Sequence, residues 1–303
     1  MTIVYILTGN GDSESRRYLS ALYLSIATLR HFHPGVETIC CTDLPMQEIL
    51  ASEQGGILSL IDQIICCTDL SGGPVYRSRL IKTTLRKRIC GPFVYLDTDT
   101  VLIGEIGELM ECRSDMGITV DQYCMDSPGM FPKWLAPHFS EIGWKYPTKK
   151  YYNAGAIFVG DTYGAHRVYD LWSSGYLISV EHGINMDQPA LNAAIEETNP
   201  ALVEYSEDYN FFCAQKPRIV PSSARVLHIC NSLRTTTVPT YELLIEEVIA
   251  GHLPSGTEIV ARLLANSNQY QSTWHALNDA ARRTYELVTR HTAFRKWFDV
   301  SKK

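Results

Sequence analysis

The sequence Phe93-Val94-Tyr95-Leu96-Asp97-Thr98-Asp99-Thr100-Val101-Leu102 runs from an apolar segment directly into two carboxylates. Its first four residues are aromatic or aliphatic and follow a Gly91-Pro92 turn, which predicts a short buried strand. Burying a carboxylate is costly unless a cation or several hydrogen-bond donors meet it. Two carboxylates at the end of a buried strand therefore indicate a site for a hard divalent cation held by oxygen ligands.

The pair Asp97 and Asp99 has three interpretations at this point. The two side chains cap the exit from strand to loop, which is a common use of aspartate. Alternatively, they form an Asp-x-Asp metal site that carries the pyrophosphate of a nucleotide-sugar. The third interpretation is the nucleophile loop of the haloacid-dehalogenase phosphatases, which residues 97–101 also fit locally. The rest of the chain must distinguish among them.

The composition limits the class of protein. The chain has 303 residues, 45% of them hydrophobic, and a net charge of -6. This length supports one large domain or two small ones with an ample core, and the mild acidity argues against a general nucleic-acid binder. The nine cysteines include no Cys-x-x-Cys pair, so we expect reduced core thiols in a cytoplasmic protein. Neither a secretory signal nor a stretch of transmembrane length is visible.

The N-terminal third alternates between strand and helix patterns. The patterns predict strands at residues 3–7, 36–41 and 61–67, helices near 18–30, 46–52 and 77–90, and a fourth strand before Asp97. A β-α-β-α-β order is typical of a mainly parallel sheet with helices on both faces. Ligands bind at the carboxyl ends of such strands. Thr8, Gly9 and Asn10 should therefore share one crevice with Asp97.

Further elements are predicted in the second half of the chain. Residues 151–160 indicate a strand that begins with small residues and so permits close approach of a ligand. Residues 186–195 indicate a helix, with Asp187 as a candidate N-cap and Pro189 in its first turn. A short strand at 225–229 contains His228, and residues 240–303 read as helical.

Four sequence motifs occur in a characteristic order. They are Tyr95-Leu96-Asp97-Thr98-Asp99-Thr100, Asn153-Ala154-Gly155, Asp187-Gln188 followed by Ala190-Leu191-Asn192, and His228. Together they resemble the GT-A-fold glycosyltransferases, and most closely glycosyltransferase family 8, the galactosyltransferase and glycogenin group. The resemblance spans about residues 3–234. The phosphatase interpretation fits less well, because that family places its nucleophile strand close to the N-terminus. In this chain a full β-α-β-α-β pattern precedes Asp97.

The chain departs from the family pattern in two places. The family often continues its histidine motif as His-x-x-Gly-x-x-Lys-Pro-Trp, whereas this chain has Asn231 and Arg234 at the Gly and Lys positions and no Pro-Trp. Asparagine can adopt the left-handed conformation that glycine would supply, and arginine can replace lysine as a phosphate donor with a different geometry. The first strand ends in Thr8-Gly9, where several relatives carry an acidic residue.

The resemblance implies a role for each matching residue. Asp97, Asp99 and His228 would hold Mn²⁺ or Mg²⁺, and Arg79, Lys82 and Arg234 would contact the pyrophosphate of the donor. Thr8, Gly9 and Asn10 would line the nucleobase and ribose, with Thr98 near the ribose. Asn153, Asp187 and Gln188 would face the sugar, with Gln188 beside its anomeric carbon. Taken alone, His228 also fits a core histidine, Asp187 a plain helix cap, and Arg79 and Lys82 a solvated helix face.

The implied activity is a metal-dependent transfer of a hexose, glucose or galactose, from a UDP-sugar to a glycan or glycoconjugate, with retention of configuration. The implied fold is α/β, a GT-A sheet flanked by helices, with a helical C-terminal region. The expected boundaries are a catalytic domain over residues 1–239, with a nucleotide-binding part at about 1–105 and an acceptor part at about 106–239, and an extension over 240–303. Two alternatives stay open: a haloacid-dehalogenase-like phosphohydrolase that uses Asp97, and a degenerate protein that binds nucleotide or glycan without turnover.

Two segments have open interpretations. Residues 121–150 are aromatic and proline-rich, and they form either an acceptor pocket or an ordinary packed insertion. Residues 282–303 hold seven Lys or Arg against two acidic residues, interleaved with aromatic side chains. Such a segment either contacts an anionic membrane surface, here the inner face, or forms a solvated helix packed on its own domain.

Overall fold

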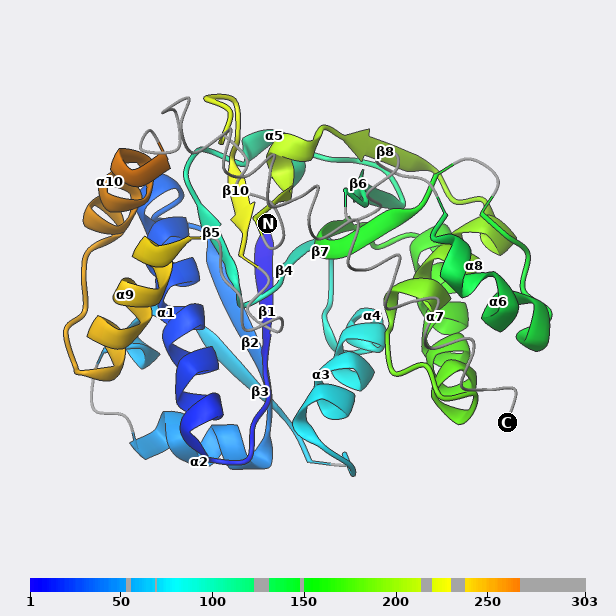
Figure 1. The fold of residues 1–303 in the computed structure, drawn as a ribbon, viewed down its shortest axis with the longest axis horizontal. Helices are drawn as coiled ribbons and strands as arrows, with labels where there is room; N and C mark the ends of the chain where they lie inside the picture. Colours follow the sequence, from blue (N-terminus) through cyan, green and yellow to red (C-terminus); the bar gives the residue numbers. More distant parts are fainter. Residues whose placement is uncertain are drawn as a thin grey trace, which may run out of the picture.

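The computed structural model describes residues 1–52, 56–68, 70–122, 131–147, 150–213, 220–229 and 238–267. A seven-stranded sheet forms its centre, in the order β3-β2-β1-β4-β7-β6-β8 (Figure 1). In that order its strands are β3 (Gln63–Cys67), β2 (Glu37–Asp43), β1 (Thr2–Leu7), β4 (Phe93–Leu96), β7 (Tyr152–Val159), β6 (Met116–Val120) and β8 (Leu202–Tyr205).

The strands of the N-terminal third pair in parallel, as the β-α-β-α-β pattern predicts. β1 pairs in parallel with both β2 and β4, and β2 pairs with β3. Beyond β4 the direction changes, because β7 is antiparallel to both β4 and β6, while β6 and β8 are again parallel. The mainly parallel α/β sheet expected from the sequence is therefore confirmed.

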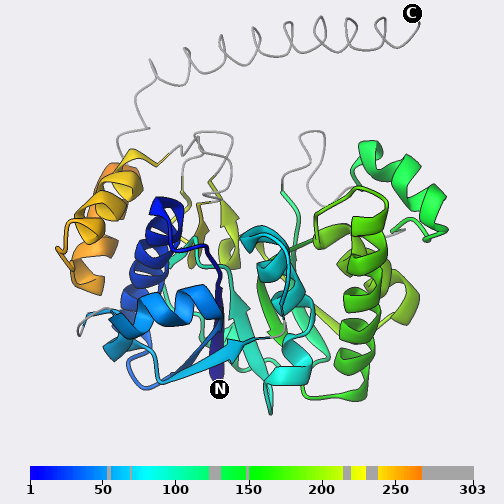
Figure 2. The same ribbon diagram turned by 90° about the horizontal axis from the view of Figure 1, so that it is seen from below.

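Helices cover both faces of this sheet. The described α-helices are α1 (Ser13–Phe32), α2 (Leu44–Ser52), α3 (Pro74–Thr83), α4 (Leu85–Arg88), α5 (Gly107–Met110), α6 (Ala136–Ile142), α7 (Tyr163–Glu181), α8 (Gln188–Thr198), α9 (Pro239–Ile249) and α10 (Gly256–Ser267). Alternate residues of a strand point to opposite faces. Tyr5 packs in one core with α1, α9 and α10, whereas Val4 packs in a second core with α3, α7 and α8. Figures 1 and 2 show these two helical layers on opposite sides of the sheet.

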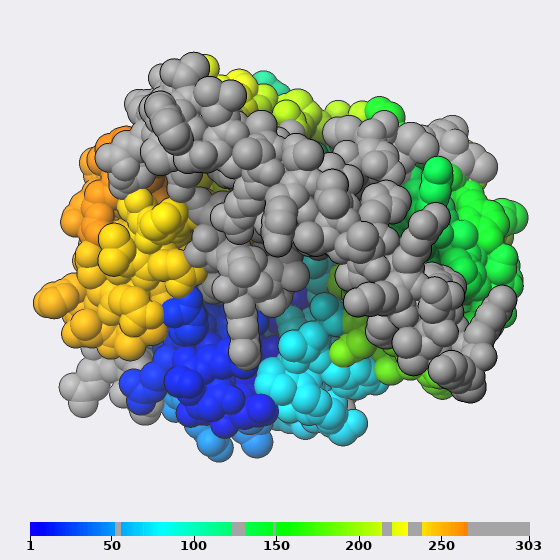
Figure 3. Space-filling view, in the orientation of Figure 1, coloured from blue at the N-terminus to red at the C-terminus, as the bar shows by residue number. Residues whose placement is uncertain are grey.

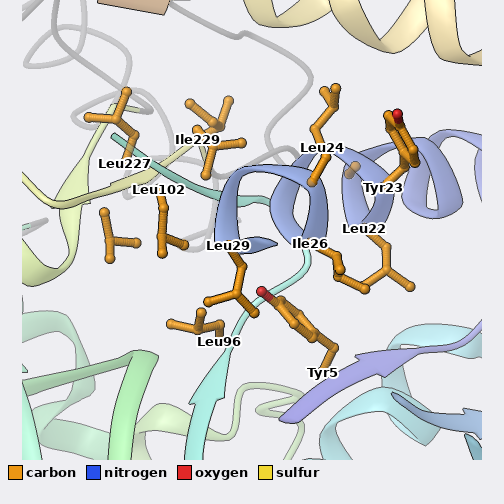
Figure 4. Packing of buried hydrophobic residues seen from close by; sticks show 14 of the residues in the cluster. Tyr5, Leu22, Tyr23, Leu24, Ile26, Leu29, Leu96, Leu102, Leu227 and Ile229 are labelled. Carbon is orange, nitrogen blue, oxygen red and sulfur yellow. The ribbon is translucent and has the colours of Figure 1, made fainter. Parts of the chain in front are cut away.

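A second, three-stranded sheet lies against the first core. Its order is β5-β10-β9, formed by β5 (Thr100–Leu102), β10 (Val226–His228) and β9 (Phe211–Phe212). β10 is antiparallel to β5, so His228 pairs with Thr100. Figure 4 shows Leu102 and Leu227 of this sheet in the same buried cluster as Tyr5, Leu29 and Leu96. This pairing brings a histidine from late in the chain beside the Asp97-x-Asp99 turn.

The structure differs from the prediction of a single helix over residues 77–90. The structure has two helices instead, α3 beginning at Pro74 and α4 ending at Arg88, with Thr84 between them. The Thr84 hydroxyl donates to the carbonyl oxygens of Leu80 (2.8 Å) and Ile81 (3.1 Å). Such side-chain bonds compete with the backbone ladder of a helix and favour a break.

The described part of the middle segment is packed. Phe139 of α6 stacks with Tyr146 at 6.0 Å between ring centroids and meets Trp144 edge-on at 5.2 Å. Leu135, Phe139 and Tyr151 form the buried centre of this aromatic cluster. Residues 123–130 and 148–149 of the segment lie outside the described residues.

The C-terminal helices α9 and α10 pack on the outer side of α1 (Figure 2). In Figure 3, α9 in yellow adjoins the blue N-terminal part of the chain at the surface. The helical prediction for residues 240–303 can be compared only as far as Ser267, and the basic segment 282–303 lies outside the described residues. Among the described residues, no helix is long and apolar enough to cross a membrane.

Candidate active site

Two carboxylates and one imidazole converge where β4 ends. One ligand atom from each of Asp97, Asp99 and His228 lies within 4.8 Å of the other two. The Nε2 atom of His228 is 3.4 Å from Oδ1 of Asp99 and 3.7 Å from Oδ2 of Asp97. Two carboxylate oxygens and one imidazole nitrogen form a donor set that suits Mn²⁺, since an all-oxygen set is more typical of Mg²⁺. We call these three residues the metal cluster.

Backbone hydrogen bonds fix the positions of the metal cluster. The Asp97 N–H donates to the carbonyl oxygen of Gly155 (2.9 Å), which ties the end of β4 to β7. The Ile229 N–H donates to the carbonyl oxygen of Asp99 (2.9 Å), which ties β10 to the same turn. Two strands from distant parts of the chain thus hold the three side chains in one place.

A buried lysine lies behind Asp97. The Lys82 Nζ atom of α3 is 3.1 Å from Oδ1 of Asp97 and lies over the ring of Tyr95, 4.7 Å from its centroid. The Tyr95 hydroxyl donates to the same carboxylate oxygen. Both donors contact Oδ1, and Oδ2 of Asp97 is the oxygen nearer to His228. One carboxylate oxygen is therefore held by the protein, while the other faces the cluster.

Asp187 precedes α8 but does not cap it. Its side chain makes no capping hydrogen bond, and it faces two cations of α3 instead, with Arg79 Nε at 3.7 Å and Lys82 Nζ at 3.8 Å. Its Oδ2 atom is buried and has no hydrogen-bond donor within reach. A buried carboxylate oxygen without a donor is costly, so a hydroxyl or amine of a ligand would satisfy it. This geometry argues against the plain-cap interpretation.

A row of hydrogen-bonded side chains links the metal cluster to Gln188. The row contains Asp121, Gln188, Asn153, Asn210 and His228. Asn153 donates from Nδ2 to Oε1 of Gln188 (3.3 Å) and accepts at Oδ1 from Asn210 (2.8 Å). Asn210 in turn contacts Nδ1 of His228 at 3.0 Å. We call this row the amide relay.

The loop after β1, residues 8–10, is held by charged groups. Arg77 of α3 donates from Nη2 to the carbonyl oxygen of Gly9 (2.7 Å) and from Nε to the buried Asp43 carboxylate (2.8 Å). Asp43 also accepts from the Gly9 N–H (3.2 Å). The Asn10 N–H donates to the Ser15 hydroxyl (3.0 Å). A Cβ atom at Gly9 would lie 2.6 Å from Sδ of Met46 and 2.8 Å from Cβ of Ser15, so a larger residue would displace these side chains.

The charges of the site shift two pKa values upward. Burial alone lowers the pKa of Lys82, but Asp97 and Asp187 outweigh it and hold the pKa above its usual range. Burial likewise lowers the pKa of His228, and Asp99 and Asp97 outweigh it and raise the pKa. The carboxylates thus favour the protonated, cationic forms of both side chains.

The structure brings most of the predicted site residues to one edge of the sheet. Asp97, Thr98 and Asp99 form the turn after β4, His228 lies against it, and Lys82 and Arg79 approach from α3. Asn153, Asp187 and Gln188 gather beside them, and Thr8, Gly9 and Asn10 follow the neighbouring strand β1. Arg234 lies outside the described residues.

Three residues of the site were not predicted from the sequence. Arg77 and Asn210 are described above, and Asp121 accepts a hydrogen bond from Gln188. Asp121 had a usable signal, because it follows an apolar strand as Asp97 does. Asn210 also had one, since it is an amide within the aromatic run Tyr209-Asn210-Phe211-Phe212. Arg77 had no distinguishing signal beside Arg79 and Lys82.

No protein-family model matches the sequence, and no curated protein matches it significantly. Solved structures of glycosyltransferases are similar to it in fold. The galactosyltransferase LgtC, solved with donor and acceptor sugar analogues, has a TM-score of 0.56 at 17% identity, over 84% of this chain and 97% of LgtC. An active-site mutant of LgtC, with a glutamine replaced by glutamate, also has a TM-score of 0.56, at 16% identity and the same coverage.

Two further glycosyltransferases are similar at lower identity. GlyE of Streptococcus pneumoniae TIGR4 has a TM-score of 0.52 at 12% identity, over 88% of this chain and 64% of GlyE. Mouse xyloside xylosyltransferase 1 has a TM-score of 0.52 at 12% identity, over 76% of this chain and 99% of that enzyme. These similarities confirm the GT-A fold that the four motifs led us to expect. At these identities they establish the fold alone.

Proposed function

We propose that the protein is a metal-dependent glycosyltransferase that moves a hexose, glucose or galactose, from a UDP-sugar to a glycan or glycoconjugate with retention of configuration. The observation that carries this proposal is the metal cluster at the carboxyl end of β4, in a fold shared with glycosyltransferases. In this proposal residues 1–239 form the catalytic domain, divided near residue 105 into nucleotide-binding and acceptor parts, and 240–303 form an extension.

Asp97, Asp99 and His228 would hold Mn²⁺, or Mg²⁺ as the alternative, together with two phosphate oxygens of the donor. A bound ion there supplies charge neutralisation for the diphosphate leaving group. Lys82 and Arg79 lie on the α3 side of the same site and provide fixed positive charge. Arg234 is proposed to contact the pyrophosphate on sequence grounds only.

Asp187 and Gln188 suit the sugar. The buried Oδ2 of Asp187 lacks a donor, and a sugar hydroxyl would supply one. Gln188 presents an amide, which cannot form the stable covalent link that a carboxylate could. If the retention of configuration implied by the family resemblance holds, a front-face route follows. The LgtC mutant supports this assignment by analogy, since a glutamine belongs to the active site of that enzyme.

The β1 loop with Thr8, Gly9 and Asn10, together with Thr98, would bind the nucleobase and ribose. The acceptor would approach from the aromatic middle segment around Phe139 and Trp144. An acceptor that contains sugar is supported by the LgtC complex, which holds an acceptor sugar analogue. A cytoplasmic location, with peripheral membrane contact through the basic residues 282–303, stays a proposal that rests on the sequence.

The phosphohydrolase alternative is disfavoured by the surroundings of Asp97. A nucleophilic carboxylate oxygen must be free to attack phosphorus. Lys82 and Tyr95 both bind one oxygen of Asp97, and the other oxygen faces His228 in the metal cluster. These contacts suit a ligand role better than a nucleophile role.

The test is a thermal-shift panel with UDP, GDP, CDP and ADP, each with Mn²⁺ and with EDTA. A ligand that binds only the folded state raises the melting temperature, so we expect a selective UDP shift that requires Mn²⁺. The shift should vanish in Asp99→Asn and persist in Asp170→Asn, which removes a surface carboxylate paired with Lys87. Hydrolysis of UDP-glucose and UDP-galactose then identifies the sugar, and tight binding without any turnover would indicate a nucleotide-binding protein. No shift with any nucleotide would overturn the proposal.

A further inference from the structure

The amide relay joins the metal cluster to the sugar side of the site. Its five side chains come from the ends of β6 and β10, from β7, from the start of α8 and from the turn before β9. Asn153 and Asn210 form its centre, and both are buried, with Asn210 only 2% exposed. The Asn210 Nδ2 atom also donates to the Thr119 hydroxyl at 3.2 Å. A buried row of this kind is costly unless every member is satisfied.

Two contacts with groups of fixed character determine which atom donates in every hydrogen bond of the amide relay. The Gly155 N–H donates to Oδ1 of Asn153 (2.8 Å), and a backbone N–H can only donate. The amide oxygen of Asn153 must therefore lie on that side. At the far end the Asp121 carboxylate can only accept, so Gln188 presents its NH₂ group to it.

These two points orient the remaining bonds. Because Asn153 Oδ1 is an acceptor, Asn210 turns its NH₂ group towards it, at 2.8 Å. The oxygen of Asn210 then faces Nδ1 of His228 at 3.0 Å, so Nδ1 carries the hydrogen and donates. When the ring is neutral, its lone pair therefore lies on the other nitrogen, Nε2, which faces Asp97 and Asp99. That is the tautomer in which an imidazole can bind a cation through Nε2.

We propose that Asn210 is a positioning residue that keeps His228 in its cation-binding tautomer and couples cation binding to the orientation of Gln188. This inference rests on the proposed function for its ligands, but the tautomer itself is a property of the protein alone. Residues that orient metal-binding histidines change metal affinity by about 10- to 100-fold when they are removed. Coupling between two sites is reciprocal in free energy.

The tautomer is tested first, without nucleotide or metal. Nitrogen-15 NMR of histidine-labelled protein distinguishes a protonated from an unprotonated ring nitrogen, and the His228→Gln variant assigns the signal. At a pH high enough to leave the ring neutral, we expect Nδ1–H with unprotonated Nε2 in the wild type, and a mixture of tautomers in Asn210→Ala. A neutral wild-type ring whose single proton lies on Nε2 would overturn the inference, whatever the protein does with UDP.

The affinity is tested second, by Mn²⁺ titration followed by electron paramagnetic resonance at saturating UDP. Asn210→Ala should weaken Mn²⁺ binding by about 10-fold or more, while Asn210→Asp, which keeps an acceptor towards Nδ1, should retain most of it. Asn185→Ala, which removes an exposed amide outside the relay, is the matched control. Equal Mn²⁺ affinity in folded Asn210→Ala and wild type would remove the positioning role. A wild type that binds neither Mn²⁺ nor UDP would instead reject the proposed function.

The coupling is tested by a double-mutant cycle with Gln188→Ala. If both residues act through one relay, the double variant should bind Mn²⁺ about as weakly as Asn210→Ala alone. Additive losses would show that the two residues act independently and would overturn the coupling. Circular dichroism spectra show whether each variant is folded. If Asn210→Ala does not fold, Asn210→Asp takes its place in the comparison.

Discussion

Gly155 faces the imidazole of His228 with no room for a side chain between them. A Cβ atom at position 155 would lie 2.5 Å from Nδ1 of His228 and would overlap Cε1. A Cβ atom essentially never makes a non-bonded contact this short, so a larger residue would displace the ring. Gly155 belongs to a strand that is buried along its whole length, and the backbone itself has little freedom to move.

We therefore expect Gly155→Ala to weaken Mn²⁺ binding by roughly 10-fold or more while the sheet stays folded. Calorimetric titration of Mn²⁺ in the presence of UDP measures this loss. Gly107→Ala is the matched control, because nothing lies within 4 Å of a Cβ atom there. Wild-type Mn²⁺ affinity in Gly155→Ala would show that His228 is not a ligand.

The buried Lys82 neutralises two carboxylates, and its removal should destabilise the protein. Removing one partner of a buried ion pair, while the other charge stays buried, costs about 3–5 kcal/mol. Asp97 is partly exposed, so we expect Lys82→Met to lower the free energy of unfolding by about 2 kcal/mol in EDTA. Urea unfolding measures it. Added Mn²⁺ and UDP should restore part of the loss, since a cation replaces the missing charge.

Two variants check the cause of that loss. Lys87→Met breaks an exposed pair with Asp170 and should cost less than about 1 kcal/mol. The pair Lys82→Met and Asp187→Asn should cost less together than the sum of the single changes, because the neutral amide introduced at position 187 no longer needs a cation. Strict additivity would mean that the ion pair contributes nothing.

Arg77 should affect nucleotide binding without entering the chemistry. It fixes the β1 loop through the Gly9 carbonyl and the Asp43 carboxylate, so its loss should loosen the proposed nucleobase site. We expect Arg77→Ala to raise the Michaelis constant for the UDP-sugar by about 10-fold with a smaller change in turnover number. Arg77→Lys should rescue poorly, because lysine cannot reproduce the two-sided guanidinium contact.

The control for Arg77→Ala is Arg113→Ala, which removes an arginine outside the site. The Arg113 guanidinium donates to the carbonyl oxygens of the neighbouring residues Glu111 and Cys112. Steady-state kinetics with each variant separate the two constants. A fall in turnover number at an unchanged Michaelis constant would place Arg77 in the reaction rather than in the loop.

His33 should make stability depend on pH. Its Nε2 atom accepts a hydrogen bond from the Ile106 N–H at 3.0 Å, and burial lowers its pKa although Glu105 opposes this. As pH falls, the unfolded chain binds a proton at this histidine before the folded chain does. The contribution of His33 is therefore complete above about pH 6.5 and declines below it.

Urea midpoints measured from about pH 8 to pH 5 test this sign. His33→Gln keeps an acceptor for Ile106 but does not titrate. As pH falls, the unfolding free energy of the wild type should therefore decrease relative to that of the variant. A difference that is constant with pH would show that His33 has the same pKa in both states.

The sequence predicted the parts of the fold that depend on neighbouring residues. Asp97 and Asp99 lie on one strand end, and the parallel N-terminal strands follow from the helices between them. The antiparallel direction of β7 was not predictable, because a strand buried on both faces has the same apolar pattern in either direction. The break at Thr84 depends on a hydroxyl that bonds to its own helix, which periodicity does not report.

The site was predictable in its motif residues and not in their connections. Asn210 lies in the site because β9 and β10 pair in parallel, and nothing local marks that pairing. Arg77 lies two residues from Arg79 on the same helix, and only the direction of α3 places one on the β1 loop and the other on Asp187.

The antiparallel pairing of β10 with β5 has a consequence for synthesis of the chain. The four strands β3, β2, β1 and β4 precede residue 100, so they can assemble while the rest of the protein is still being translated. His228 joins Asp99 only after the ribosome has released more than two-thirds of the chain. Contacts between such distant segments form slowly. We therefore expect nascent chains that end before β10 to fold the parallel part of the sheet without binding Mn²⁺. The cation should bind only after most of the chain has been synthesised.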